Sequence, residues 1–235
     1  MTECAVWWSE PITATADALA LLDPVERDRY DAYRRPEDQR RFLTGRVLAK
    51  NVAGHRLGLE PEKVHFDASC PDCDRQHGPV RVPGAALQLS ISHAGDRVGV
   101  AATTGAPVGL DVESAQRNAD DSLISYALSE AEQKSLPTDA DGRARAFFTF
   151  WTRKEALMKA TGRGLRIPLQ SLTLSSADAP ARLLVSDDTS LSPETTKLAD
   201  LDAGPGYRAA VAVLTSEEID ITERWWHPGA VLDGQ

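Results

Sequence analysis

The sequence has little of what marks secreted and membrane proteins. Its 235 residues include three cysteines, an odd number that suits a reducing cytoplasm better than a disulfide framework. No run approaches about 18 uninterrupted apolar residues, so no membrane span is predicted. The first residues, MTECAVWWSEPITA, carry an acid early and lack the basic start and apolar run of a signal peptide. We therefore expect a cytoplasmic protein.

Positive charge is also in deficit. The chain has 26 Lys and Arg against 35 Asp and Glu, a formal net charge of −9, which disfavours non-specific nucleic-acid binding. A local basic cluster could still bind an anionic ligand or an acidic protein partner. The 42% hydrophobic and 26% charged residues are ordinary for a soluble globular protein, and 235 residues are enough for one large domain or two small ones sharing a core.

Hydrophobic periodicity predicts two long helices, at residues 37–57 and 143–160, ended by Gly58 and by Thr161-Gly162. Shorter helices are predicted from about Ala14, from Asp23-Pro24 and over residues 122–134, which contain a capping-box pattern at Ser129. Residues from about 223 have turn chemistry and are expected to form a loose tail. Strands are predicted at residues 4–8, 87–92, 98–103, 108–112, 172–174, 181–185 and 207–214.

The two halves of the chain share an outline. In each, a long helix is entered through aromatic and basic residues and is followed by a Gly-Leu pair, at 58–59 and 164–165, and then by strands. We predict an α+β fold of two pseudo-twofold subdomains, residues 1–105 and 106–222, with a tail at 223–235. Each subdomain would be a small, mainly antiparallel sheet packed on a long helix. The cleft between them is a natural ligand site, and we expect a monomer.

Four charged residues are candidates for chemistry. Asp111 and Glu113 in VGLDVES are two apart, so on a strand both carboxylates face one side and could bind Mg²⁺; a solvated strand edge is the alternative. Glu155 and Lys159 lie at i and i+4 on a helix. One interpretation is a surface ion pair. In the other, Glu155 is a third metal ligand or a base, and Lys159 binds a phosphate.

A Ser-His pair, Ser92-His93 in ISHAGD, ends a predicted strand before a tight turn. A histidine in such a place is either a structural residue or a donor to a phosphate. Together, ISHAGD, VGLDVES and FWTRKEALMKATGRGL resemble, in order and spacing, three motifs of the Sfp-type phosphopantetheinyl transferase superfamily. Trp151 and Lys154-Glu155-Ala156 are similar to its W-KEA branch, and the resemblance spans about Arg27 to Leu214.

The resemblance implies magnesium-dependent transfer of 4'-phosphopantetheine from coenzyme A to a serine of an apo acyl, polyketide or peptidyl carrier protein, releasing 3',5'-ADP. The alternative is a non-catalytic coenzyme A or nucleotide binder. The implied metal ligands are Asp111, Glu113 and Glu155, and the implied catalytic residues are Glu155, as general base, and Lys159, on the pyrophosphate. Arg34 and Arg46 neighbour the implied coenzyme contacts, which are Arg35, Arg41, Ser90, Ser92, His93 (on the 3'-phosphate side), Asp111, Glu155 and Lys159.

One departure concerns a Gly-Lys-Pro sequence that many relatives carry before the strands. This chain reads HGPVRVPG instead, so either Arg81 or the backbone at Gly78 would take the place of that lysine. Nearby, Cys70, Cys73 and His77 suggest an incomplete zinc site that would need a fourth ligand such as His65 or Asp74. The alternative for this segment is a loop with reduced thiols.

Overall fold

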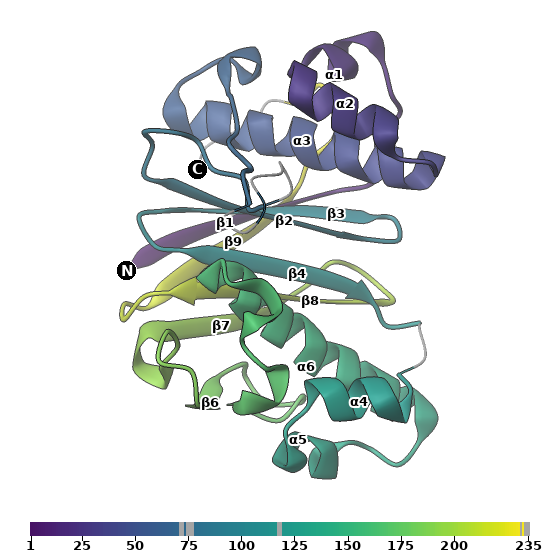
Figure 1. Cartoon of the computed structure of the whole chain (residues 1–235), viewed down its shortest axis with the longest axis vertical. Coiled ribbons are helices and arrows are strands. Elements are labelled where there is room, and N and C mark those ends of the chain that lie inside the picture. The colour runs from purple at the N-terminus through teal and green to yellow at the C-terminus, as the bar shows by residue number, and fades with distance from the viewer. Residues whose placement is uncertain (71–72, 74–77, 117–118, 231, 233–235) are drawn as a thin grey trace.

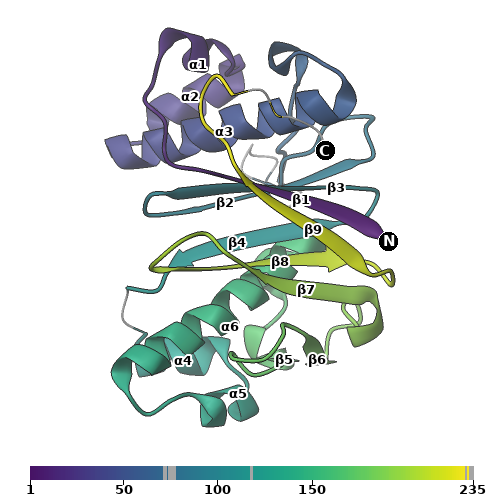
Figure 2. The ribbon, with the colours of Figure 1, turned by 180° about the vertical axis from the view of Figure 1, so that it is seen from behind.

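Two β-sheets pack face to face, and one long helix covers the outer face of each (Figure 1; seen from behind in Figure 2). The computed structural model describes residues 1–70, 73, 78–116, 119–230 and 232. The first sheet has the strand order β2-β3-β1-β9 and the second β4-β8-β7; a two-stranded sheet pairs β5 with β6. The strands are β1 Thr2–Ser9, β2 Leu87–Ala94, β3 Arg97–Thr104, β4 Val108–Ser114, β5 Leu172–Leu174, β6 Leu183–Ser186, β7 Thr196–Leu201, β8 Tyr207–Leu214 and β9 Ile219–Trp225.

The predicted α+β class, with a small and mainly antiparallel sheet packed on a long helix in each half, is confirmed. The pairing of β1 with β9 is parallel, whereas the other ladders are antiparallel. The helices are α1 Ala16–Ala20, α2 Pro24–Ala32, α3 Pro36–Leu57, α4 Asp121–Ala127, α5 Glu130–Ser135 and α6 Ala140–Thr161, with 3-10 turns at Pro61–Lys63, Gly164–Arg166, Leu169–Ser171 and Pro193–Thr195.

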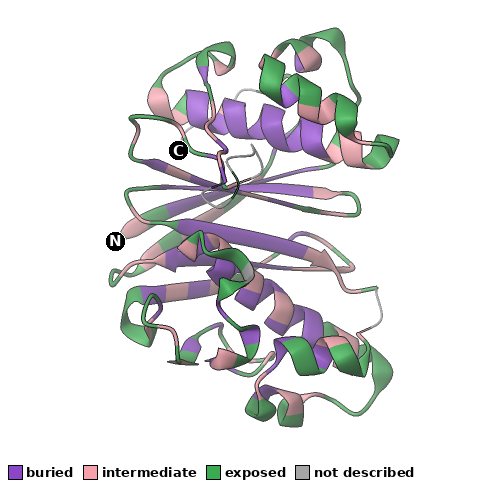
Figure 3. Cartoon of the chain, in the orientation of Figure 1, coloured by how far each residue is buried: buried purple, intermediate pink, exposed green. Residues whose placement is uncertain are grey.

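Alternation along the strands explains the layers. In β1, Val6 and Trp8 point between the sheets, while Ala5 and Trp7 pack towards α3. In β8, Val211 belongs to the core between the sheets, and its neighbours on either side pack against α6. Figure 3 shows the buried residues concentrated along the central strands and the inward faces of α3 and α6. The central strands β1, β3, β4 and β8 therefore carry almost no solvated face, whereas β9 is partly exposed along its length.

Both long helices end as predicted, at glycines in the left-handed conformation, Gly58 and Gly162, each with φ of 65°. Residues 122–134 form two helices rather than one. Leu128 and Ser129 are extended, and Ser129 caps the second helix through its predicted capping box. In the part of the chain that is described, no helix combines the length and the hydropathy needed to cross a membrane.

The C-terminal segment corrects the predicted loose tail. Glu223 and Trp225 lie in β9, which pairs with β1, and Trp226 is 3% exposed. The side chain of Trp8 donates a hydrogen bond to Glu223 Oε2 at 2.9 Å. A strand from the end of the chain thus completes the sheet of the N-terminal half. Neither β7 nor β9 was predicted, because at least half of the residues of each are polar or charged, although Ile219 and Ile221 of β9 alternate with polar residues.

Candidate active site

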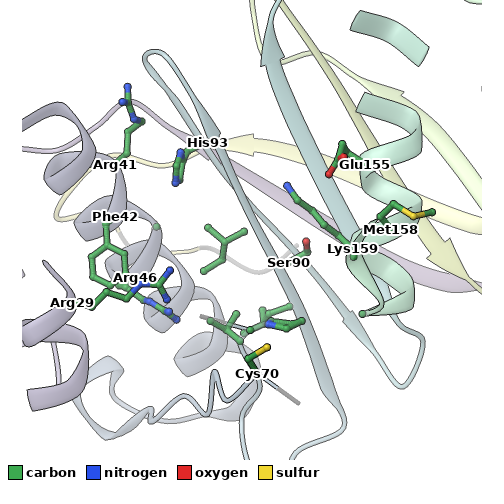
Figure 4. Close-up of a pocket in the computed structure, with 18 of the residues that line it drawn as sticks. Arg29, Arg41, Phe42, Arg46, Cys70, Ser90, His93, Glu155, Met158 and Lys159 are labelled. Atoms are coloured by element: carbon green, nitrogen blue, oxygen red, sulfur yellow. The ribbon is translucent and has the colours of Figure 1, made fainter. Parts of the chain in front are cut away.

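A cavity of about 440 Å³ opens between the two halves of the molecule. Its size lies in the range of small-molecule sites. One wall comes from α2 and α3, the opposite wall from the C-terminal half of α6, and β2 lies between them (Figure 4). Predicted site residues that line it are Arg41, Ser90, His93, Glu155 and Lys159. Secondary-structure elements far apart in sequence thus build one pocket.

The acidic end of the site depends on a close contact between α6 and β4. A Cβ atom on Gly109 would lie 1.9 Å from the carbonyl oxygen of Ala156, so glycine allows the helix to reach the strand. This contact brings Glu155 beside Asp111 and Glu113. Burial, and then the negative charge of Asp111, raise the pKa of Glu155; Glu113 adds to the rise, and Lys159 opposes it.

Asp111 is 6% exposed, and its two carboxylate oxygens differ in environment. Oδ1 accepts hydrogen bonds from Ser92 Oγ at 3.0 Å and from Lys159 Nζ at 2.7 Å. Oδ2 is buried without a hydrogen-bond partner. A buried carboxylate oxygen of this kind is costly unless a cation or a donor meets it. The environment of Asp111 therefore suits a ligand that brings positive charge.

Within the described residues, no three His, Cys, Asp or Glu side chains are gathered closely enough to hold a metal ion as they stand. Even so, two observations fit the predicted set Asp111, Glu113 and Glu155 to a hard divalent cation. One is the unpartnered Oδ2 of Asp111, and the other is the raised pKa of Glu155, which burial and then repulsion by Asp111 and Glu113 produce. Oxygen ligands of this kind are those that Mg²⁺ prefers.

The serine hydroxyls join the two sheets at their edges. Ser90 Oγ accepts a hydrogen bond from the backbone N–H of Leu110 at 2.9 Å, and Ser92 Oγ accepts one from Val112 at 3.2 Å. Both serines are buried, and Ser90 lines the cavity. These side chains therefore take over the backbone pairing that a neighbouring strand would otherwise give β4.

His93 and Arg41 form another wall of the cavity, near the tip of the β2–β3 hairpin (Figure 4). Arg41 donates to the carbonyl of Gly95 at 3.1 Å and to Asp38 at 2.5 Å, so its guanidinium has a fixed orientation. Desolvation by the surrounding protein, followed by the charges of Arg41 and Lys159, lowers the pKa of His93. The imidazole is thus favoured in its neutral form, which can still donate one hydrogen bond.

Two arginines extend the positive wall. Arg29 on α2 was missed by sequence reasoning, and Arg46 on α3 was noted as a neighbour; both line the cavity. Arg46 is 6% exposed, stacks on Phe42 at 5.3 Å, and has its Nη1 buried without a partner. Arg35 is instead an exposed residue at the start of α3 and does not line the cavity as it is described.

Arg29 could not have been singled out because α2 is rich in charge. The position in space that distinguishes it comes from the packing of α2 on α3. Glu26 of α2 pairs with Lys50 at 2.9 Å and lies 3.7 Å from Arg46, and all three side chains are nearly buried. This contact turns the next helical turn of α2, with Arg29, towards the cavity.

The lysine of the Lys-Glu-Ala sequence belongs to the core. Lys154 is fully buried, and its ammonium donates to Glu132 at 2.5 Å and to three backbone carbonyls. Arg153 beside it is also fully buried and pairs with Asp200 at 2.6 Å. Of the charged residues in the middle of this helix, Glu155 and Lys159 face the cavity, whereas Lys154 and Arg153 tie α6 to its surroundings.

The stretch that departs from the Gly-Lys-Pro pattern also meets the cavity. Gly78 lines it, whereas Arg81 is exposed and its backbone pairs with Asp67. Of the two suggested replacements, the backbone at Gly78 is therefore the one in position. For the suggested zinc site, His77 and Asp74 lie outside the described residues; Cys70 is buried on the cavity wall and Cys73 is exposed.

A pocket between two similar halves, lined by arginines and by Glu155, which has Asp111 and Glu113 as charged neighbours, defines a site for a phosphate-containing ligand. The family model for the 4'-phosphopantetheinyl transferase superfamily matches residues 107–212, and that for the 4'-phosphopantetheinyl transferase N-terminal region matches residues 7–105. The two models together cover most of the chain.

Curated relatives agree. The chain is 32% identical over 176 residues to the 4'-phosphopantetheinyl transferase psf-1 of Bacillus pumilus, covering 74% of this chain and 71% of that protein. It is 30% identical over 163 residues to the 4'-phosphopantetheinyl transferase HetI of a Nostoc strain, with 66% of each covered. With the 4'-phosphopantetheinyl transferase Sfp of Bacillus subtilis it shares 26% over 195 residues and 82% of each chain. The chain belongs to the 4'-phosphopantetheinyl transferase superfamily, of the Sfp type, and is a 4'-phosphopantetheinyl transferase.

Proposed function

We propose that this enzyme transfers 4'-phosphopantetheine from coenzyme A to a serine of an apo acyl, polyketide or peptidyl carrier protein, with Mg²⁺, and releases 3',5'-ADP. The observation that carries the proposal is a single cavity with arginines on one wall and Glu155 on the other, where the charges of Asp111 and Glu113 reach Glu155 from behind the wall. The negative charge of the phosphates of coenzyme A suits the arginines. Its diphosphate suits a metal ion held at the carboxylate end.

The basic wall suits the phosphates of coenzyme A. Arg29, Arg41 and Arg46 surround one side of the cavity, and the neutral His93 adds a hydrogen-bond donor there. Arginine binds phosphate through a planar set of N–H donors and stays charged at all physiological pH values. We assign these residues to the end of the coenzyme that carries the 3'-phosphate. Arg35, which is exposed, is left out of this assignment.

The acidic end suits Mg²⁺ held by Asp111, Glu113 and Glu155 together with the diphosphate. When bound, the cation would neutralise negative charge that develops on the leaving 3',5'-ADP. Support comes from the unpartnered Oδ2 of Asp111 and from the raised pKa of Glu155. Lys159, on the same wall, adds positive charge beside the diphosphate.

Glu155 is proposed as the general base for the serine of the carrier protein. Its raised pKa makes the carboxylate a stronger proton acceptor than an ordinary glutamate. Removing the hydroxyl proton lets the serine oxygen attack the phosphorus, and the bond from that phosphorus to 3',5'-ADP breaks. Glu155 would therefore act both as the general base and as a negatively charged ligand of the metal ion.

A non-catalytic coenzyme A binder is the second candidate. It needs the basic wall but has no use for a base of raised pKa beside two further carboxylates. The discriminating test incubates the protein with coenzyme A, Mg²⁺ and a panel of apo carriers, fatty-acid, polyketide and peptide types, followed by mass spectrometry. Transfer adds about 340 Da to the carrier, the mass of the phosphopantetheine group. Coenzyme A binding without mass gain on any carrier would favour the binder.

We further propose that the enzyme acts as a monomer, since both walls of its cavity come from one chain. Light scattering during gel filtration of the active protein tests this directly. An active species of twice the chain mass, with no activity at the monomer mass, would contradict it.

A further inference from the structure

The hydroxyl of Ser92 has its hydrogen-bonding capacity fully used inside the protein. It donates to Asp111 Oδ1 at 3.0 Å and accepts from Lys159 Nζ at 2.9 Å and from the backbone N–H of Val112 at 3.2 Å. A serine hydroxyl has one donor and two acceptor sites. No site remains with which Ser92 could bind a phosphate of the coenzyme.

The ammonium of Lys159 is saturated in the same way. Its three N–H groups meet Asp111 Oδ1 at 2.7 Å, Ser92 Oγ at 2.9 Å and the carbonyl of Leu110 at 2.9 Å. Ser92, Asp111 and Lys159 each bond to the other two, which forms a closed ring between β2, β4 and α6. Ser92 is 5% exposed and Asp111 is 6% exposed, whereas the side chain of Lys159 is 31% exposed, so the serine and the carboxylate are the members of the ring that are shielded from water.

The ring leaves one atom of Asp111 unused. Two donors meet Oδ1, whereas Oδ2 is buried without a partner. The two oxygens are chemically equivalent, so a half-turn of the carboxylate restores the same arrangement, whereas any intermediate orientation breaks both bonds. The ring thus fixes the plane of the carboxylate and leaves one oxygen, Oδ2, without a partner, and the charge of Asp111 acts on the neighbouring Glu155.

We propose that Ser92 is a positioning residue that, with Lys159, holds Asp111 so that its Oδ2 is presented to a divalent cation, and that Ser92 makes no contact with coenzyme A. The inference rests on the metal assignment of the proposed function. It departs from the role that the family resemblance implies for this serine, which is contact with the coenzyme phosphates.

Ser90 offers a matched control two residues earlier on the same strand. It is equally buried, lines the cavity, and accepts a backbone N–H of β4, that of Leu110, at 2.9 Å. In the described structure its hydroxyl makes no hydrogen bond to Asp111 or Lys159. Ser90→Ala and Ser92→Ala therefore each remove one bond between the sheets, but Ser92→Ala alone opens the ring.

The experiment measures two dissociation constants for the full-length wild-type protein and both variants. Mn²⁺, which takes the same oxygen ligands as Mg²⁺, is titrated without coenzyme and followed by electron paramagnetic resonance. Coenzyme A is titrated at saturating Mn²⁺ by calorimetry. We expect Ser92→Ala to weaken Mn²⁺ binding about fivefold, the value of one typical hydrogen bond, and to leave coenzyme A affinity within about twofold. Ser90→Ala leaves Mn²⁺ affinity at the wild-type value.

Ser92→Thr keeps the hydroxyl and should retain Mn²⁺ affinity, with a melting curve for each variant as the check on folding. Equal Mn²⁺ affinities of Ser92→Ala and Ser90→Ala, or a loss by Ser92→Ala that is confined to coenzyme A affinity, would overturn the inference alone. Failure of the wild-type protein to bind Mn²⁺ would instead overturn the metal assignment on which it rests. Should Ser92→Ala be too unstable to study, Ser92→Cys, a weak donor of similar size, provides the same comparison.

Discussion

Replacing Lys154 by methionine separates a structural from a catalytic role for the first lysine of the helix motif. Its side chain is fully buried, and its ammonium donates hydrogen bonds to Glu132 and to the carbonyls of Ala127, Leu169 and Leu172. Methionine fills a similar volume but cannot donate. The variant therefore leaves the Glu132 carboxylate buried without its cation.

The magnitude follows from that unpaired charge. Glu132 is 2% exposed and would retain only its bonds from the N–H groups of Ser129 and Leu174, both at 2.8 Å. Removing one partner of a buried ion pair typically costs about 3–5 kcal/mol. Because whole domains have free energies of unfolding of about 5–15 kcal/mol, Lys154→Met should unfold at a much lower urea concentration.

The assay combines urea unfolding with turnover per folded molecule, measured at low temperature. We expect a large loss of stability and nearly normal turnover of the molecules that remain folded. Lys134→Met is the control, because Lys134 is an exposed member of an ion pair with Glu130 and its loss should not measurably change stability. The double variant Glu132→Leu with Lys154→Met should recover part of the loss, since no charge is then left unpaired.

The structural role of Lys154 is refuted if Lys154→Met lowers the free energy of unfolding by less than about 1 kcal/mol, because a buried ion pair whose loss costs so little cannot hold the surrounding elements together. It is refuted equally if stability is normal and turnover falls. That result would mean that Lys154 leaves the core and acts on the substrate.

Three further predictions concern the site. Glu155→Gln should lower transfer by about 10²–10⁴-fold while coenzyme A still binds, and equal loss of binding and transfer would contradict its role as base. In EDTA at neutral pH the same variant should raise the melting temperature, because burial and the charges of Asp111 and Glu113 disfavour the ionised carboxylate. Burial and the charges of Asp111 and Glu113 raise the pKa of Glu155 when no cation is bound, so Mg²⁺ binding should weaken on the acid side at a higher pH than an ordinary glutamate would give; an Mg²⁺ affinity that stays constant down to the usual range of glutamate would contradict this. Gly109→Ala should lower the free energy of unfolding in urea by about 3 kcal/mol or more, because its Cβ would lie 1.9 Å from the Ala156 carbonyl oxygen. Gly58→Ala, where the space is open, is a milder comparison. Wild-type stability of Gly109→Ala would show that α6 can shift without cost.

Local patterns in the sequence were enough for much of the fold. Helix periodicity, the glycines Gly58 and Gly162, and the capping box at Ser129 have their effect within a few residues, so both long helices were predicted closely. The strands β2, β3, β4 and β8 alternate or carry apolar runs and were predicted as well. β9 was missed, because its alternation of Ile219 and Ile221 with polar residues is short and its pairing with β1 joins residues more than 200 positions apart.

The residues of the site were also predictable only in part. The sequence specifies the carboxylates that are available, those of Asp111, Glu113 and Glu155, and it carries the order of motifs that resembles one family of transferases. Tertiary structure alone decided which neighbouring charges face the ligand. Lys154 and Glu155 are adjacent in sequence, yet the packing of α6 buries one in an ion pair and turns the other to the cavity. Desolvation and hydrogen-bond saturation depend on contacts between distant elements, and these assign each residue of the motif to the core or to the site.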